Sequence, residues 1–119
     1  MNLSIDVKSP LPVYQQVIQA IKLEILSGGL CDGDPLPSIR DLAKLLKLNP
    51  NTVAKAYYAL ESEGFSEGRS GSRVKAPPGR RDALRRAMLE SEFRIFMAKA
   101  VSLGFSLADV GQLLERMKQ

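Results

Sequence analysis

Apolar residues recur at helical spacing in two neighbouring stretches in the middle of the chain. They are Ile39, Leu42, Ala43 and Leu46 in the first stretch and Val53, Ala56, Tyr57 and Leu60 in the second. Residues three or four apart lie on the same face of an α-helix, so each set forms one apolar stripe. Asn49-Pro50 separates the stretches, and a residue before proline disfavours the helical conformation. The pattern therefore predicts two short helices joined by a tight turn, the first ending near Lys47.

Capping residues stand at the expected ends of both helices. Ser38 is a natural N-cap, and Asp41 three residues later completes the pattern of a capping box. Asn49 can cap the second helix, and Pro50 suits its first position because an N–H there would lack a partner anyway. Gly64 is well placed to end this helix. Two helices, a tight turn and a polar leading edge on the second helix are typical of a helix-turn-helix.

The leading edge of the second helix carries side chains that can read DNA. They are Asn49, Asn51, Thr52 and Lys55. In a helix-turn-helix, the N-terminal residues of the second helix reach base edges in the major groove. Asn can contact adenine, Thr can touch a thymine methyl, and Lys can reach guanine or phosphate. The alternative is that Asn49 and Thr52 only cap the helix while Lys55 is solvated. The surrounding motif favours DNA contact.

The segment before these helices predicts a scaffold helix. A broad apolar stripe indicates a helix over residues 13–27, which Gly28-Gly29 ends. Residues 30–35 are rich in turn formers and predict a loop. Ahead of the helix, residues 1–11 are expected to form a loose or partly extended arm that packs against the domain or a partner subunit. Apolar and polar residues alternate over residues 3–7, so the arm could include a short edge strand.

A hairpin is predicted after the second helix of the motif. Residues 65–67 and 73–75 are short candidate strands, and residues 68–72 form a flexible tip, so the hairpin fits the wing of a winged helix. A glycine at the tip lets the backbone approach a phosphate, and the arginines can pair with phosphates or enter a minor groove. The predicted contact residues of the wing are Arg69, Ser70, Gly71 and Arg73. The alternative is an ordinary solvated hairpin, and the neighbouring motif favours DNA contact.

The C-terminal part begins with a linker, Ala76-Pro77-Pro78-Gly79, and continues as two predicted helices. The first reaches about Leu103, and Gly104 breaks it. Ser106, with Asp109 three residues later, has the pattern of a capping box and starts the last helix. Four arginines near the start of this part either touch the DNA backbone or form a solvated face. They are Arg80, Arg81, Arg85 and Arg86.

The two C-terminal helices have more apolar surface than a short hairpin can bury. Such a surface calls for a partner, and the simplest partner is the same hairpin of a second copy. The predicted dimerisation residues are Leu84, Met88, Leu89, Phe93, Ile95, Phe96, Met97, Val101, Leu107, Val110, Leu113 and Leu114. The less favoured alternative is a ligand pocket lined by Phe93, Phe96 and Met97.

Composition excludes several classes of function. The chain has 119 residues, a formal charge of +4 and a pI of about 9.4. There is no histidine and a single cysteine, Cys31, so His-based catalysis, a disulfide within the chain and a zinc cluster are excluded. Neither a signal peptide nor a membrane-spanning stretch is visible. We therefore expect a cytoplasmic protein that is not an enzyme and holds no cofactor or metal.

The residues from Leu36 to Ala43, followed by those from Asn49 to Tyr57, resemble the GntR family of bacterial transcription regulators, and most closely its YtrA-type branch. The resemblance extends from about Pro12 to Val74. It implies a winged helix-turn-helix that binds operator DNA as a dimer, with a short helical C-terminal segment for dimerisation. The positions that match its DNA contacts are Arg40, Asn49, Asn51, Thr52, Lys55 and the wing around Ser70-Gly71.

The sequence thus predicts a mainly α fold with a small β-hairpin wing. Residues 1–76 are the predicted DNA-binding domain, and residues 77–119 are the linker and dimerisation hairpin. The expected function is a homodimeric regulator, a repressor, on a pseudo-palindromic operator in double-stranded DNA. The full set of predicted DNA contacts is Ser38, Arg40, Lys44, Asn49, Asn51, Thr52, Lys55, Arg69, Ser70, Gly71 and Arg73. The alternative is a protein-interaction module, and the sequence leaves a small-molecule effector unknown.

Overall fold

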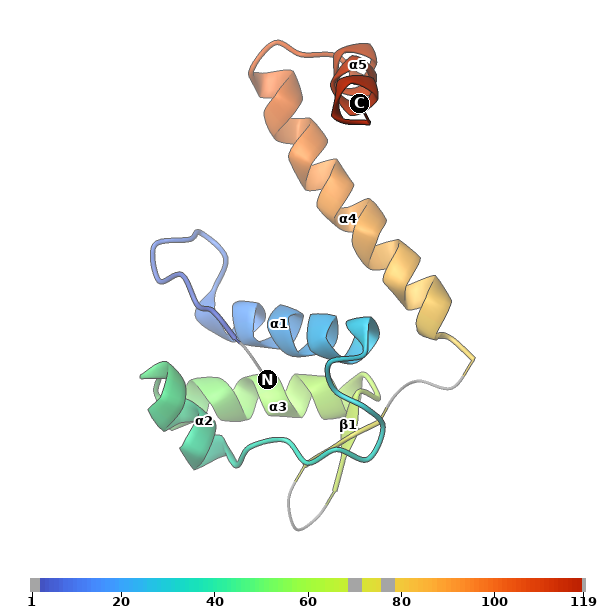
Figure 1. Ribbon diagram of the computed structural model, residues 1–119. Helices are drawn as coiled ribbons and strands as arrows, with labels where there is room; N and C mark the ends of the chain where they lie inside the picture. Colours follow the sequence, from blue (N-terminus) through green and yellow to red (C-terminus); the bar gives the residue numbers. More distant parts are fainter. Residues whose placement is uncertain (1–2, 69–71, 76–78, 119) are drawn as a thin grey trace. The chain divides into compact units, whose positions relative to one another are not determined.

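A computed structural model describes residues 3–68, 72–75 and 79–118 (Figure 1). Its elements, in chain order, are α1 (Val13–Ser27), α2 (Ile39–Leu46), α3 (Pro50–Ser62), β1 (Ser66–Glu67), β2 (Arg73–Val74), α4 (Arg81–Ser102) and α5 (Leu107–Met117). They confirm the predicted mainly α fold with a small β-hairpin. The chain divides into two compact units, residues 1–81 and residues 82–119. The predicted boundary between residues 76 and 77 lies outside the described residues.

The core of the first unit forms where α3 packs against both α1 and α2. In Figure 1, α1 runs alongside α3. The largest fully buried side chains come from all three helices and from the hairpin, and they are Val17, Ile21, Ile25, Leu42, Val53, Leu60 and Val74. Burial of one such side chain contributes about 1.5–3 kcal/mol relative to leaving it exposed. The apolar stripes in the sequence therefore define the surfaces on which the helices meet.

The turn between α2 and α3 begins earlier than Asn49-Pro50. Lys47 adopts a left-handed conformation with φ of 56° and is the C-cap of α2. The N–H of Leu48 donates to the carbonyl of Ala43 at 2.9 Å, which satisfies a carbonyl at the end of the helix. At the other end, Ser38 Oγ accepts from the Asp41 N–H at 3.0 Å. Only this half of the predicted capping box is present among the described residues.

Lys47→Gly should stabilise the first unit by about 0.5–1 kcal/mol. A residue with a Cβ is strained in the left-handed region, whereas glycine adopts it freely. Urea unfolding followed by circular dichroism would report a higher midpoint. Lys44→Gly, in the last turn of the same helix, is the matched control and should lower the midpoint, since glycine costs about 1 kcal/mol within a helix. An equal fall of the urea midpoint in both variants would contradict backbone strain at Lys47.

The wing is larger than the two predicted strands. Ser66 of β1 pairs with Val74 of β2 in antiparallel register. The predicted loop 30–35 also contributes, because the Gly33 N–H donates to the Val74 carbonyl and the Val74 N–H donates to the Asp34 carbonyl, both at 2.8 Å. A bridge between Pro35 and Arg73 continues this pairing. Residues 33–35, which precede α2, thus pair with the side of β2 that β1 leaves free. This pairing connects the hairpin to the helix-turn-helix.

Tyr57 ties α3 to the segment before α2. Its hydroxyl donates to the Pro37 carbonyl at 2.7 Å. The side chain is buried, and burial raises the pKa of Tyr57 to about 12 because the phenolate would lose its hydration. The hydroxyl therefore stays protonated at neutral pH and keeps its hydrogen bond.

The short edge strand that the sequence allowed over residues 3–7 does not form. Residues 3–12 contain turns and bends but no strand, and this arm is held by one side chain of α1. Gln16 Oε1 accepts from the Asp6 N–H at 2.8 Å, and Gln16 Nε2 donates to the carbonyls of Asp6 (2.8 Å) and Leu11 (2.9 Å). The Gln16 amide thus forms hydrogen bonds with three backbone groups of the arm. In an edge strand, a neighbouring strand would have to provide such hydrogen bonds.

The second unit consists of α4 and α5. Only Ala100 and Val110 are buried among its described residues. Ser106 and Asp109 form the complete predicted capping box at the start of α5. Within the described residues, no helix combines the length and the apolar content needed to cross a membrane.

Candidate nucleic-acid interface

The outward face of α3 is opposite the face that packs into the core. Val53, Ala56 and Leu60 face the core and are fully buried. Helical geometry places Asn51, Lys55, Tyr58 and Ser62 on the other side, and all four are exposed. Residues 50–60 contain no acidic side chain, so an anionic ligand meets no repulsion along most of this face. Of the glutamates near the end of α3 and in the wing, Glu63 pairs with Lys22 at 2.9 Å and Glu67 pairs with Lys75 at 3.6 Å. Glu61 is exposed at the end of the same helix.

Asn49 is the N-cap of α3. Its Oδ1 accepts from the Asn51 N–H at 2.8 Å, and the following turn is closed by the Thr52 N–H, which donates to the Asn49 carbonyl at 3.0 Å. A bidentate contact with adenine needs both the oxygen and the nitrogen of the amide. While Asn49 caps the helix, its oxygen is already bonded to the Asn51 N–H, so a base would have to share it. Asn51 has no side-chain hydrogen bond among the described residues, so its whole amide is available.

Lys55 contacts a residue of α1 that is distant from it in the sequence. Its Nζ lies 3.9 Å from the centroid of the Tyr14 ring. The Tyr14 hydroxyl in turn accepts from Gln15 Nε2 at 3.2 Å. A cation over an aromatic face contributes about 0.5–1 kcal/mol at an exposed site. Tyr14 therefore favours one position of the ammonium group, at the side of α3 that faces α1.

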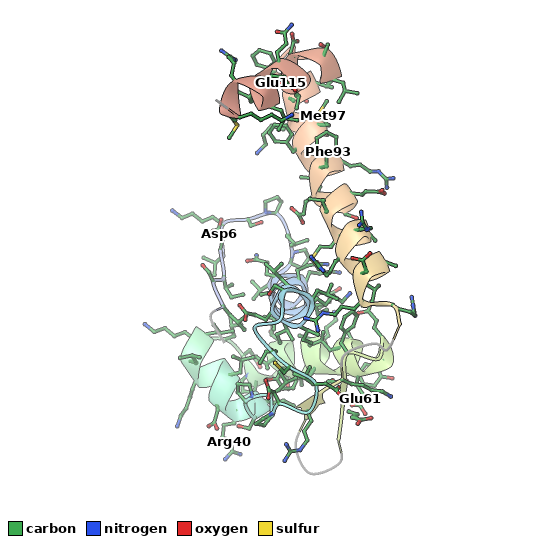
Figure 2. All side chains as sticks on the ribbon, turned by 45° about the vertical axis from the view of Figure 1, so that its right-hand side comes forward. Asp6, Arg40, Glu61, Phe93, Met97 and Glu115 are labelled. Atoms are coloured by element: carbon green, nitrogen blue, oxygen red, sulfur yellow. The ribbon has the colours of Figure 1, made fainter. Side chains whose placement is uncertain are left out.

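The predicted phosphate contacts of α2 lie on its surface. Arg40 and Lys44 are exposed, and Figure 2 shows Arg40 projecting outward from α2, away from α1. Ser38 is exposed, but its hydroxyl oxygen is used as the N-cap. In the wing, Arg73 is exposed and its Nη1 donates to the Gly33 carbonyl at 3.2 Å. Arg69, Ser70 and Gly71 lie outside the described residues.

The four arginines near the start of α4 do not form one cationic surface. Arg81 Nη2 donates to the Ile25 carbonyl at 3.0 Å, where a cation opposes the negative end of the α1 dipole. Arg86 and Arg85 both pair with Asp82, at 3.0 and 3.9 Å. Three of the four predicted cations thus have partners within the chain.

The predicted dimerisation residues differ in exposure. Eight are exposed: Leu89, Phe93, Ile95, Phe96, Val101, Leu107, Leu113 and Leu114. Leu84, Met88 and Met97 are partly buried, and Val110 is only 7% exposed. Val110 therefore packs inside the α4–α5 hairpin and presents little surface to a second copy. Phe93 and Phe96 stack on each other with ring centroids 6.4 Å apart, and Figure 2 shows Phe93 on the second half of α4.

Sequence reasoning missed two aromatic residues at this interface. Tyr58 is 75% exposed on the outward face of α3, seven residues after Asn51. Its helical spacing from Asn51 and Lys55 was a signal that could have included it with them. Tyr14 had no such signal, since its contact with Lys55 joins two helices that are distant in the sequence.

Two helices joined by a tight turn, with α1 behind them and a hairpin beside them, define a winged helix-turn-helix. The family described as bacterial regulatory proteins, gntR family, matches residues 13–75. The chain therefore belongs to the GntR family.

Individual relatives agree with this assignment. The chain is 49% identical over 65 residues to the HTH-type transcriptional repressor YtrA of Bacillus subtilis, a match that covers 55% of this chain and 50% of that protein. The structure of YtrA from Sulfolobus acidocaldarius, a GntR-family transcription factor, is 38% identical, with a TM-score of 0.61 over 75% of this chain and 95% of that one. AraR(DBD) in complex with operator ORX1 is 25% identical, with a TM-score of 0.56 over 62% of this chain and 98% of that one.

Proposed function

We propose that this protein is a sequence-specific DNA-binding repressor that occupies an operator as a homodimer. The observation that carries the proposal is the outward face of α3, where Asn51 and Lys55 are exposed and acidic side chains are absent through residue 60. The similarity to AraR(DBD), which was solved with an operator, supports DNA as the ligand. Asn51 and Thr52 are the proposed base readers, and Arg40 and Lys44 are proposed phosphate contacts.

We further propose that residues 77–119 hold the two copies together. The support is the row of exposed apolar side chains on α4 and α5, which would be costly to leave in water. A two-fold dimer presents two α3 helices, so its operator should be pseudo-palindromic, with half-sites about one helical turn or a multiple apart. Such a regulator would act in the cytoplasm and perform no catalysis, since binding alone blocks a promoter.

Selection of binding sites from a random pool of duplex DNA tests this function. The selected duplexes are then measured across a range of salt concentrations, because affinity that depends only on phosphate contacts falls alike for all sequences. A recovered two-fold motif would support the proposal, and its half-site spacing would give the distance between recognition helices. Binding that is equally weak for every sequence would overturn it. Indifference to all duplexes at low salt would instead favour a protein-interaction module.

A further inference from the structure

The ammonium group of Lys55 and the ring of Tyr14 join the outward face of α3 to the start of α1. Lys55 Nζ lies 3.9 Å from the ring centroid, well inside the distance of about 6 Å within which a cation and an aromatic face attract each other. Among the described residues, Lys55 forms no ion pair, since the ion pairs there involve other cations. The position of this ammonium therefore depends on the ring and not on a carboxylate.

A second lysine–aromatic contact in the same unit shows what distinguishes Lys55. Lys22 Nζ lies 5.2 Å from the centroid of the Phe65 ring, and the Glu63 carboxylate also binds it, at 2.9 Å. A carboxylate neutralises the cation that it holds, whereas an aromatic ring attracts a cation through its quadrupole and adds no net charge. The charge of Lys22 is thus used within the protein. Lys55 is held as well, but it keeps its full charge for an anion outside the chain.

The ring draws the ammonium to one side of α3. Tyr14 belongs to α1, which packs against α3 and runs alongside it in Figure 1. A helix with its side chains is about 10–12 Å across and the major groove of DNA is about 12 Å wide. Bases therefore face the leading edge of a recognition helix, whereas a cation at the side of the helix meets the phosphates that border the groove. The position over Tyr14 suits a phosphate contact.

We propose that Tyr14 is a positioning residue for operator binding, whose ring holds the Lys55 ammonium where it contacts a DNA phosphate. The inference rests on the operator binding proposed above. A lysine side chain is a flexible four-carbon stem, and ordering it at a phosphate costs conformational entropy. The ring raises the fraction of free molecules in which Lys55 already has the bound position, and the affinity rises with that fraction. Tyr14 thus strengthens binding without changing which bases are preferred.

Tyr14→Leu tests this inference in the full chain, because leucine keeps an apolar side chain and removes the aromatic face. We expect about two- to fivefold weaker binding to every duplex, the factor that a cation–π contact at an exposed site supplies. The slope of log affinity against log salt should not change, because the phosphate contact still forms, whereas Lys55→Ala should reduce that slope by about one. In the Lys55→Ala background, Tyr14→Leu should have no further effect on affinity.

Tyr14→Phe is the matched control, because it keeps the ring and removes only the hydroxyl. It should restore the affinity that Tyr14→Leu loses. Spectra of the free protein with ¹³C-labelled lysine give a readout that needs no DNA. The ring current should shift the Lys55 ε-protons upfield in the unchanged protein and in Tyr14→Phe, but not in Tyr14→Leu, and Lys55→Ala identifies the signal.

Several results would overturn the positioning role of Tyr14. Tighter operator binding by Tyr14→Leu would show that DNA draws the ammonium away from the ring. A loss that persists in the Lys55→Ala background would assign Tyr14 a structural role or a DNA contact of its own, and thermal unfolding of each variant would tell these two apart. Equal affinity of Tyr14→Leu and the unchanged protein would end the inference but leave operator binding standing. If the unchanged protein binds no duplex, the proposed function fails and the inference fails with it.

Discussion

Leu89→Glu combined with Ile95→Glu should convert the protein to monomers and weaken its binding to a full two-fold operator about 100-fold or more. Both side chains are largely exposed within the single chain, at 70% and 64%, so the change should not unfold α4. In a dimer these positions would be buried, and glutamate would place uncompensated charge there. Two linked DNA-binding units gain about 10²–10⁴ in affinity over one, and monomers lose this gain.

Analytical ultracentrifugation measures the mass, and a titration of operator DNA at the same protein concentrations measures the affinity. Ser91→Glu adds a charge at an exposed polar position of the same helix and is the control. It should leave both quantities unchanged. A variant that stays dimeric would exclude these two residues from the interface. A monomer that binds the full operator as tightly as the unchanged protein would show that dimerisation through α4 is not needed for operator binding.

The helices of the first unit could be predicted because their signals are local. The stripes of α1, α2 and α3 use residues within four positions of each other, and the caps Ser38 and Asn49 act within three positions. The same locality explains the capping box of α5. Such contacts form in any compact arrangement of the chain, so the sequence alone identifies them.

The contacts that could not be predicted join segments far apart in the sequence. The Gly33 N–H pairs with the Val74 carbonyl, which extends the wing with a segment that reads as a plain loop. Lys55 meets Tyr14, and Gln16 holds the N-terminal arm in place of a strand. In each case the partner is chosen by the packing of other elements, and no spacing in the sequence specifies it.

The candidate site itself was predicted in part. The sequence places four polar residues at the start of α3 but does not assign a separate role to each. The structure uses Asn49 Oδ1 as a cap and brings Lys55 to the Tyr14 ring, while Asn51 remains free. The same residue types therefore divide between holding the helix and remaining exposed without a partner, and only three-dimensional contacts distinguish the two.

Asn51→Ala should weaken binding to the selected operator by about 1–3 kcal/mol, or roughly 10- to 100-fold, and relax the preference at one base pair of each half-site. The side chain is exposed and its amide has no described partner in the protein, so the fold should not change. The cap is kept as well, because Asn49 Oδ1 accepts from the backbone N–H of residue 51. Competition binding against a panel of single-base operator variants measures both effects.

Asn49→Ser is the matched control, since serine also caps helices but has no amide to read a base. It should preserve the base preferences if Asn49 only caps. Lys55→Ala gives the contrasting pattern: if the ammonium contacts phosphate, all duplexes weaken alike and the slope of log affinity against log salt falls by about one. A uniform loss for Asn51→Ala, with every base preference retained, would contradict base reading by Asn51. Unchanged affinity would remove Asn51 from the interface, and the outward face of α3 would then need another ligand.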